Sequence, residues 1–241
     1  MINENIAKRI VDLMVEAATI IEIGPGKGIL SKFLIQKFKN IFLIEIDKEC
    51  VNYLVKENVP DHVKVINADF LKIDLNQFEK PINLIGSLPY SITSQIFFKI
   101  LNSYFFINYC VFVVQLEVAK RLLAKPNTKN YGILSVLLQA YYVLKKHFII
   151  HPNNFRPIPA VYSAVITLKR KEKVPEVNFS DFLKVVKCTF NKRRKLVYNN
   201  LKEIIPENLI LDKYRKLRAE NLTLEDYINL TLIYSKNGNK K

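Results

Sequence analysis

Three of the chain's six glycines lie within one short segment, Gly24-Pro25-Gly26-Lys27-Gly28, between an apolar run and a helical pattern. A backbone without Cβ lets a ligand approach closely at the start of a helix, so this segment is a candidate binding loop. The third glycine does not have the spacing of the dinucleotide fingerprint, since the pattern here is GxGxG and not GxGxxG. An ordinary strand-to-helix turn is the alternative interpretation.

Carboxylates stand at the ends of the apolar runs around this loop. Glu22 precedes the glycines, Glu45 ends the next run, and Asp69 follows the third. At one edge of a parallel sheet, Glu45 could accept both hydroxyls of a ribose, and Asp69 could accept a hydrogen bond from the amine of adenine. Acidic side chains around a glycine loop suit a cationic nucleoside better than a pyrophosphate. S-adenosylmethionine, an adenosine joined to a sulfonium, meets this requirement.

The fourth apolar run ends in Gly86-Ser87-Leu88-Pro89-Tyr90. An adenine amine is a poor nucleophile because its lone pair is delocalised into the ring. The side chain of Ser87 and the carbonyl of Leu88 could accept its two hydrogens, while Tyr90 could stack on the base. A sulfonium leaving group drives methyl transfer without a strong general base, so catalysis would be mostly positioning. A proline-containing turn capped by a buried tyrosine is the alternative interpretation.

The elements that must position these residues alternate along the first two-thirds of the chain. Helical patterns separate most of the apolar runs, which predicts parallel pairing and a doubly wound α/β sheet. Two later runs, at residues 140–150 and 161–168, indicate a pair of strands at the sheet edge. The other predicted strands are residues 19–23, 41–46, 63–66, 82–85 and 109–114, and the predicted helices are residues 29–38, 48–57 and 93–101.

Composition changes near residue 170. Residues 169–241 hold 18 basic and 9 acidic side chains, against 19 and 13 in the first 168 residues, and helical patterns replace strands. We therefore predict a cofactor-binding catalytic domain at residues 1–170 and a helical domain at residues 171–241. The net charge of +15 favours a polyanionic partner, with a general bias toward lysine as the alternative. Within the helical domain, Lys192-Arg193-Arg194-Lys195 is a candidate for contact with RNA phosphates or else a solvated helix face.

Other functions are disfavoured by what the sequence lacks. The three cysteines are far apart without a CxxC pair, and the three histidines have no metal-ligand spacing, so we expect neither a disulfide framework nor a metal. The longest apolar runs are far short of the ~20 residues of a membrane helix. We expect a cytoplasmic protein, and a monomer.

Taken together, these motifs resemble the KsgA family, the small-subunit ribosomal RNA adenine dimethyltransferases, which are related to the Erm methyltransferases. The resemblance covers essentially the whole chain. The glycine loop is shared by many methyltransferases, whereas the strings Phe155-Arg-Pro-Ile-Pro-Ala-Val-Tyr-Ser-Ala-Val165 and Arg218-Ala-Glu-Asn-Leu222 are much more specific. Residues 44–47, 86–90 and 190–195 also match.

This resemblance implies a Rossmann-like class I methyltransferase domain with a small C-terminal helical domain. It also implies that S-adenosylmethionine is used to dimethylate two adjacent adenosines in the 3′-terminal hairpin loop of 16S rRNA, in the small ribosomal subunit or its precursor. Phe155 corresponds to an aromatic residue near the flipped base, with a core role as the alternative. The candidate cofactor-binding residues are Glu22, Gly24, Gly26, Gly28, Glu45, Ile46, Asp69, Phe70 and Ser87; the candidate catalytic residues are Ser87, Leu88, Pro89, Tyr90 and Phe155; the candidate RNA-binding residues are Lys192, Arg193, Arg194 and Lys195.

The chain departs from the family pattern at two places. Ser87 stands where the family usually has Asn, and the family's Gln-x-Phe-Leu segment would immediately precede the match to residues 2–5. We expect weaker S-adenosylmethionine binding than in a version extended by that segment. An Erm-like enzyme acting on large-subunit rRNA and a non-catalytic ribosome-assembly factor remain alternatives.

Overall fold

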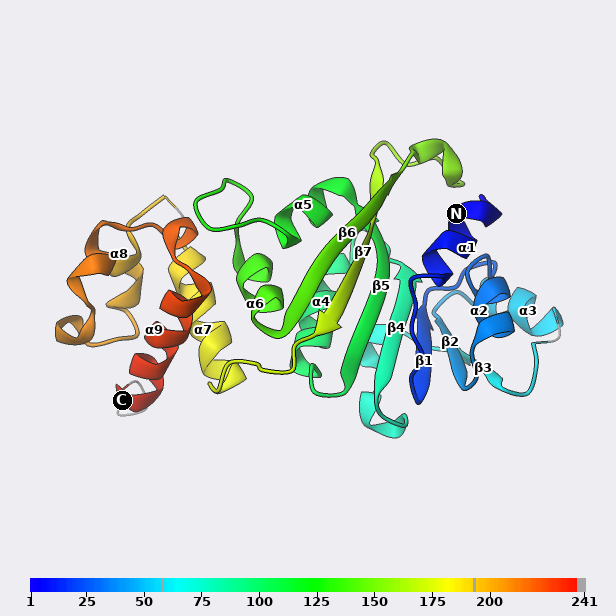
Figure 1. The fold of residues 1–241 in the computed structure, drawn as a ribbon, viewed down its shortest axis with the longest axis horizontal. Helices are drawn as coiled ribbons and strands as arrows, with labels where there is room; N and C mark the ends of the chain where they lie inside the picture. Colours follow the sequence, from blue (N-terminus) through cyan, green and yellow to red (C-terminus); the bar gives the residue numbers. More distant parts are fainter. Residues whose placement is uncertain (58, 193, 238–241) are drawn as a thin grey trace. The chain divides into compact units, whose positions relative to one another are not determined.

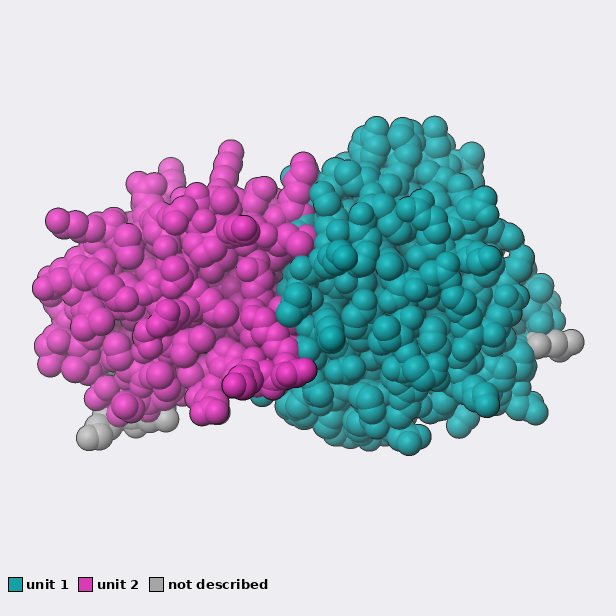
Figure 2. Space-filling model, in the orientation of Figure 1, with its two compact units in different colours: residues 1–119, 143–170 teal, residues 120–142, 171–241 magenta. Residues whose placement is uncertain are grey.

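The structure, a computed structural model, describes residues 1–57, 59–192 and 194–237. Figure 1 shows the order of its elements, and Figure 2 shows its two compact units. Unit 1 comprises Met1–Ala119 and Val143–Arg170, and unit 2 comprises Lys120–Tyr142 and Lys171–Lys241. The chain leaves unit 1 after Arg170, and the division into a catalytic domain at residues 1–170 and a helical domain at residues 171–241 stays a prediction. Unit 2 also takes in Lys120–Tyr142, a segment that the division drawn from composition assigns to the first domain.

Unit 1 is built on a seven-stranded sheet with the order β3-β2-β1-β4-β5-β7-β6 (Figure 1). The first five strands pair in parallel, and β5 pairs with β7 antiparallel. This arrangement confirms the predicted α/β class and the late strands at the sheet edge. The strands are β1 (Thr19–Ile23), β2 (Ile41–Glu45), β3 (Val63–Asn67), β4 (Ile82–Ser87), β5 (Ile107–Gln115), β6 (Tyr142–Ile150) and β7 (Ser163–Arg170).

Helices bury the central strands of this sheet from both sides. All five residues of β1 are buried, as expected for a parallel strand covered on both faces. On one face, Ile20, Leu43 and Val113 join residues of the first two helices in a single hydrophobic cluster. The helices of unit 1 that precede β5 are α1 (Glu4–Val11), α2 (Ser31–Lys37), α3 (Lys48–Lys56) and α4 (Thr93–Asn102), and the short 3₁₀ turns are η1 (Phe70–Lys72), η2 (Leu75–Gln77) and η3 (Pro152–Asn154).

The strand order reverses between β1 and β4, and this point positions the candidate site. In open α/β sheets, ligands bind at the carboxyl ends of the strands where the order reverses. The two strands approach each other closely there: a Cβ added to Gly86 would lie only 2.5 Å from the carbonyl oxygen of Ile23. Glycine at position 86 therefore allows the end of β4 to lie directly beside the end of β1 and the glycine loop.

The segment between β5 and β6 differs from expectation. It forms α5 (Leu116–Leu122) and α6 (Ile133–Tyr141), and β6 begins only at Tyr142. The prediction that residues 140 and 141 start a strand was wrong. A nearly continuous apolar run crosses the junction, so periodicity there does not separate the end of a buried helix from the start of a strand.

Unit 2 is helical, as predicted for the C-terminal region. Besides α6, it contains α7 (Phe179–Phe190), α8 (Val197–Leu201) and α9 (Leu224–Asn237), with the 3₁₀ turns η4 (Glu207–Leu209), η5 (Asp212–Lys216) and η6 (Ala219–Asn221). Its core is aromatic: the rings of Phe190 and Tyr227 stack with centroids 6.1 Å apart, and Tyr131 lies 6.4 Å from Phe190. α6 packs against α7 and α9, which explains why residues 120–142 group with the C-terminal helices.

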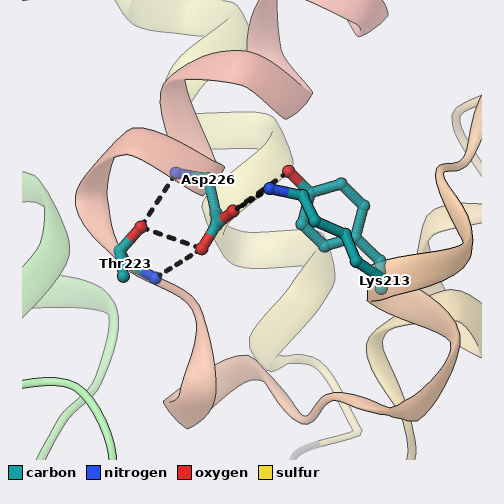
Figure 3. Close-up of polar contacts among 4 residues, drawn as sticks. Lys213, Thr223 and Asp226 are labelled. Atoms are coloured by element: carbon teal, nitrogen blue, oxygen red, sulfur yellow. Dashed lines mark hydrogen bonds and ion pairs between the residues drawn. The ribbon is translucent and has the colours of Figure 1, made fainter.

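A carboxylate fixes the start of α9 (Figure 3). Asp226 Oδ2 accepts hydrogen bonds from the Thr223 backbone N–H at 3.0 Å and the Thr223 hydroxyl at 2.8 Å, while the Asp226 N–H donates to Thr223 Oγ1 at 3.2 Å. This reciprocal pair is a capping box. The other oxygen, Oδ1, lies 2.7 Å from Lys213 Nζ and accepts from the Tyr214 hydroxyl at 3.2 Å. One side chain thus joins η5 to the first turn of α9.

Two further findings concern the described part of the chain. None of its helices combines the length and the apolar character needed to cross a bilayer. Among the same residues, no three His, Cys, Asp or Glu side chains are grouped so that they could hold a metal ion.

Candidate active site

The glycine loop leaves β1 with three left-handed backbone conformations. Gly24, Gly26 and Gly28 have φ values of 63°, 57° and 78°, which glycine adopts at little cost. A Cβ on Gly28 would lie 2.8 Å from Leu54 Cδ2, so this glycine allows close packing against α3. A Cβ on Gly24 or Gly26 would meet no heavy atom of the described residues within 4 Å. The space beside these two glycines is open to a ligand.

Glu45 holds the loop from the end of β2. Its Oε2 accepts a hydrogen bond from the Gly26 N–H at 2.9 Å, and its Oε1 accepts from the Asp47 N–H at 3.0 Å. A carboxylate can accept about four hydrogen bonds, so each oxygen keeps acceptor capacity for a ligand hydroxyl. The residue is 8% exposed, which fixes this carboxylate against the loop. Ile46, the next residue, presents a 67% exposed side chain at the same strand end.

Glu22 lies inside β1 and not at its tip. Its side chain is buried, and its Oε2 accepts a hydrogen bond from the Ser31 hydroxyl at 2.6 Å. Burial raises the pKa of Glu22 to about 8, the Ser31 hydrogen bond opposes this rise, and the nearby Glu45 charge adds to it. At neutral pH the Glu22 carboxyl is therefore mostly protonated.

The turn after β3 offers one acceptor and one donor side by side. Asp69 caps η1, with its Oδ1 accepting from the Leu71 N–H at 2.9 Å. Within the described part of the chain, neither Asp69 Oδ2 nor the Phe70 backbone N–H has a hydrogen-bond partner. The Phe70 ring is buried, so only the backbone of that residue can face a ligand. An adjacent acceptor and donor match the amine and the ring nitrogen on one edge of adenine.

Ser87 is the last residue of β4, and together with the turn that follows, residues 88–90, it offers two unengaged acceptors. Ser87 is partly exposed, and neither its hydroxyl nor the Leu88 carbonyl has a hydrogen-bond partner among the described residues. The backbone here is fixed, because the Leu88 N–H donates to the Val113 carbonyl at 3.0 Å and the Pro89 carbonyl accepts from Thr93 Oγ1 at 2.7 Å. Two free acceptors on a rigid turn can hold the two hydrogens of an amine.

Tyr90 is an exposed aromatic ring with an anchored end. The residue is 39% exposed, and its hydroxyl lies 2.9 Å from Oγ of Ser163, at the start of β7. Tyr90 is therefore not the buried cap of a plain turn, the alternative that the sequence left open. Its ring is available for stacking while its direction is fixed.

Phe155 lies in the hydrophobic core of unit 1. It is 8% exposed and belongs to the same cluster as Val113, Ile150 and Val165. The core role, which the sequence left open as an alternative, is the one seen here. Contact with a target base stays a prediction.

In the sequence, the basic run falls between α7 and α8. Lys192, Arg194 and Lys195 are exposed, and Arg193 lies outside the described residues. These side chains border a hollow of about 530 Å³ whose lining also includes Lys202 and Arg218. Lys202 and Arg218 are not among the RNA-binding residues that the sequence predicts. Arg218 opens a recognised motif, whereas nothing in the sequence marks Lys202.

Comparison with known proteins yields concordant matches. Residues 1–236 match the family described as Ribosomal RNA adenine dimethylase. The chain is 40% identical over 248 residues to the Ribosomal RNA small subunit methyltransferase A of Parabacteroides distasonis, covering 98% of this chain and 91% of the relative.

Two solved structures share the fold. A dimethyladenosine transferase from Plasmodium falciparum has a TM-score of 0.83 and 23% identity, covering 98% of this chain and 97% of that one. The 23S rRNA methyltransferase ErmE has a TM-score of 0.74 and 22% identity, covering 97% and 98%. At these identities, the two structures establish the architecture and not the substrate.

Proposed function

Because the chain belongs to the ribosomal RNA adenine dimethylase family, we propose that it dimethylates the exocyclic amines of two adjacent adenosines in the 3′-terminal hairpin loop of small-subunit (16S) rRNA. The methyl donor is S-adenosylmethionine. The observation that carries the catalytic assignment is the pair of unengaged acceptors, Ser87 Oγ and the Leu88 carbonyl, beside the glycine loop. A ribosomal substrate implies action in the cytoplasm, and we propose a monomer.

The residues around the glycine loop fit the cofactor. Open space beside Gly24 and Gly26 admits a ligand, Glu45 keeps acceptor capacity for ribose hydroxyls, and the edge formed by Asp69 and Phe70 complements adenine. S-adenosylmethionine supplies an activated methyl group on a sulfonium. The role of this part of the chain is to bind and orient.

The turn at residues 87–90 prepares the amine. Ser87 Oγ and the Leu88 carbonyl accept hydrogen bonds from the two amine hydrogens and hold them out of the plane of the base. The nitrogen then becomes tetrahedral, and its lone pair is available for attack on the methyl group. Tyr90 stacks on the base, an interaction worth roughly 1–3 kcal/mol. The shorter Ser87 in place of Asn keeps an acceptor oxygen. Positioning of this kind contributes to rate without a general base.

The proposal is tested by incubating the chain with labelled S-adenosylmethionine and undermethylated small or large ribosomal subunits, followed by nucleoside analysis of each rRNA. We expect dimethyladenosine in the small-subunit rRNA alone. Ser87→Ala should lower the rate on the order of 100-fold, because one of the two acceptors is lost. The cofactor affinity of this variant, measured separately by calorimetry, shows whether the cofactor site is intact.

Two outcomes would contradict the proposal. Label confined to the large-subunit rRNA would identify an Erm-like specificity. Binding of S-adenosylmethionine and of small subunits without any transfer would identify an assembly factor with the methyltransferase fold.

A further inference from the structure

We propose that Lys99 is a positioning residue for the cofactor's adenine, holding the turn that presents the Asp69 carboxylate and the Phe70 N–H. This inference rests on the proposed function, since it concerns the same cofactor site. Lys99 lies on α4, outside every sequence motif discussed above.

The Lys99 ammonium binds backbone carbonyls of the turn that follows Asp69. Its Nζ donates hydrogen bonds to the Leu71 carbonyl at 3.1 Å and to the Ile73 carbonyl at 2.5 Å. It also lies 5.5 Å from the centroid of the Phe70 ring. A single cation thus contacts three residues of the segment that follows Asp69, and α4 and η1 pack against each other.

The contact reaches Asp69 through one residue, Leu71. The Leu71 N–H donates to Asp69 Oδ1 at 2.9 Å, and the Leu71 carbonyl accepts from Lys99. The Lys72 N–H donates to the Asp69 carbonyl at 2.9 Å, which closes the turn. Because Leu71 is held at both ends, Lys99 fixes the direction in which the Asp69 carboxylate points.

The surroundings of Lys99 indicate more than a surface lysine. Its side chain is partly buried, and burial lowers its pKa, while the facing carboxylates of Asp74 and Asp69 raise it. Long cationic side chains usually keep their charge in water, so a partly buried ammonium calls for specific partners. Here those partners are the carbonyls of the adenine-facing turn.

Calorimetry with S-adenosylhomocysteine tests this role. We expect Lys99→Met to weaken binding by about tenfold, because the turn loses a charged hydrogen-bond donor. Lys99→Arg, which keeps a donor to carbonyls, should restore most of the affinity. Lys72→Met is the matched control: Lys72 is an exposed lysine of the same turn, and its removal should leave affinity within about twofold.

A second ligand shows whether Lys99 positions the adenine-binding turn in particular or stabilises the whole cofactor site. The analogue of S-adenosylhomocysteine that lacks the 6-amino group cannot donate to Asp69. Because the analogue keeps only the ring-nitrogen contact with the Phe70 N–H, Lys99→Met should weaken its binding by clearly less than it weakens binding of S-adenosylhomocysteine. The variant's KM for ribosomal subunits should remain that of the wild type. If the methionine variant does not fold, as judged by circular dichroism, Lys99→Gln replaces it in both titrations.

The outcomes separate this inference from the proposed function. Equal losses for the two ligands, or no loss for either, would overturn the role of Lys99 while leaving methyl transfer by the wild type intact. Failure of the wild type to bind S-adenosylhomocysteine at all would instead contradict the proposed function.

Discussion

Glu22 is a carboxylic acid buried within the central strand β1, and its protonation couples the stability of unit 1 to pH. Its pKa is about 8 in the folded chain, against an ordinary value of 4.5. Between these values the folded state keeps a proton that the unfolded state releases. This residue therefore lowers the free energy of unfolding as pH rises, by up to about 1.4 kcal/mol per pH unit, and its effect vanishes below pH 4.5.

We predict that Glu22→Gln abolishes this contribution. A neutral glutamine can still accept the Ser31 hydrogen bond, so the variant should match the wild type near pH 4.5 and exceed it in stability near pH 8. Denaturant titrations at several pH values measure the difference. Glu16→Gln, at an exposed glutamate, is the control and should follow the wild-type curve. A constant difference between Glu22→Gln and wild type across this pH range would show that Glu22 is ionised in the folded chain.

At the scale of elements, a polar contact between Tyr90 and Ser163 joins the turn after β4 to the start of β7. Ser163 is fully buried, and its hydroxyl holds the Tyr90 hydroxyl at 2.9 Å while the Tyr90 ring stays exposed. We predict that Ser163→Ala raises the KM for ribosomal subunits by about 3- to 10-fold, because the ring loses its fixed direction. The dissociation constant for S-adenosylhomocysteine should not change.

A double-mutant cycle checks the contact. Tyr90→Phe should raise KM to a similar extent, and the Tyr90→Phe, Ser163→Ala pair should be no worse than either single variant. Additive effects of the two substitutions would mean that the hydroxyls act independently. Loss of cofactor affinity in Ser163→Ala would instead point to a general disturbance of β7.

The first turn of α9 depends on Asp226 (Figure 3). Partial burial alone would raise the pKa of Asp226, but hydrogen bonds from Lys213 and Thr223 outweigh it and hold the pKa below its ordinary value of 3.8. The carboxylate therefore stabilises the fold above pH 3.8, and this contribution is lost as pH falls through the lowered pKa.

We predict that Asp226→Asn lowers the free energy of unfolding at pH 7 by about 1 kcal/mol, the usual cost of a lost helix cap. The loss should shrink as pH falls through the lowered pKa of the wild-type carboxyl, because that carboxyl then becomes neutral as well. Glu225→Gln, in the same helical turn but exposed, is the control and should change stability by less than about 0.5 kcal/mol. A pH-independent loss for Asp226→Asn would assign the effect to packing and not to charge.

At the scale of the whole molecule, the sequence predicted unit 1 well because its signals are local. Strand β1 was predicted at residues 19–23, where it occurs, and the other strands of the sheet within a few residues at each end. A β-branched run bounded by glycine or a charge carries enough information for such assignments. The helix α6 was missed because its residues are apolar on nearly every side.

The site was predicted as a list of residues, and its connections were not. Glu45 and Ser87 were chosen from their places at strand ends, yet nothing in the sequence shows that Glu45 holds the Gly26 N–H or that Tyr90 reaches Ser163. Such contacts join residues far apart in the chain. Lys99 shows the same limit, since a lysine within a helix pattern has no local sign of the carbonyls that it binds.

The net charge of +15 gives the last prediction, because it makes RNA affinity depend on salt. Arg194 and Lys195 border the basic hollow of unit 2 and are exposed. If both contact phosphates, Arg194→Gln with Lys195→Gln should flatten the slope of log affinity against log salt by about 1.4, since each lost contact with single-stranded RNA removes about 0.7. Filter binding of the 3′-terminal hairpin RNA at several salt concentrations measures this slope.

A charge-matched variant shows whether position or total charge matters. Lys173→Gln with Lys236→Gln removes two exposed lysines of unit 2 that do not line the hollow. Long-range attraction would fall equally in both double variants, because they carry the same net charge, and then the two slopes would coincide. Direct phosphate contact flattens the slope only for Arg194 and Lys195. Since bound counterions are released only where a phosphate is neutralised, a difference between the two variants would locate the RNA on the turn between α7 and α8.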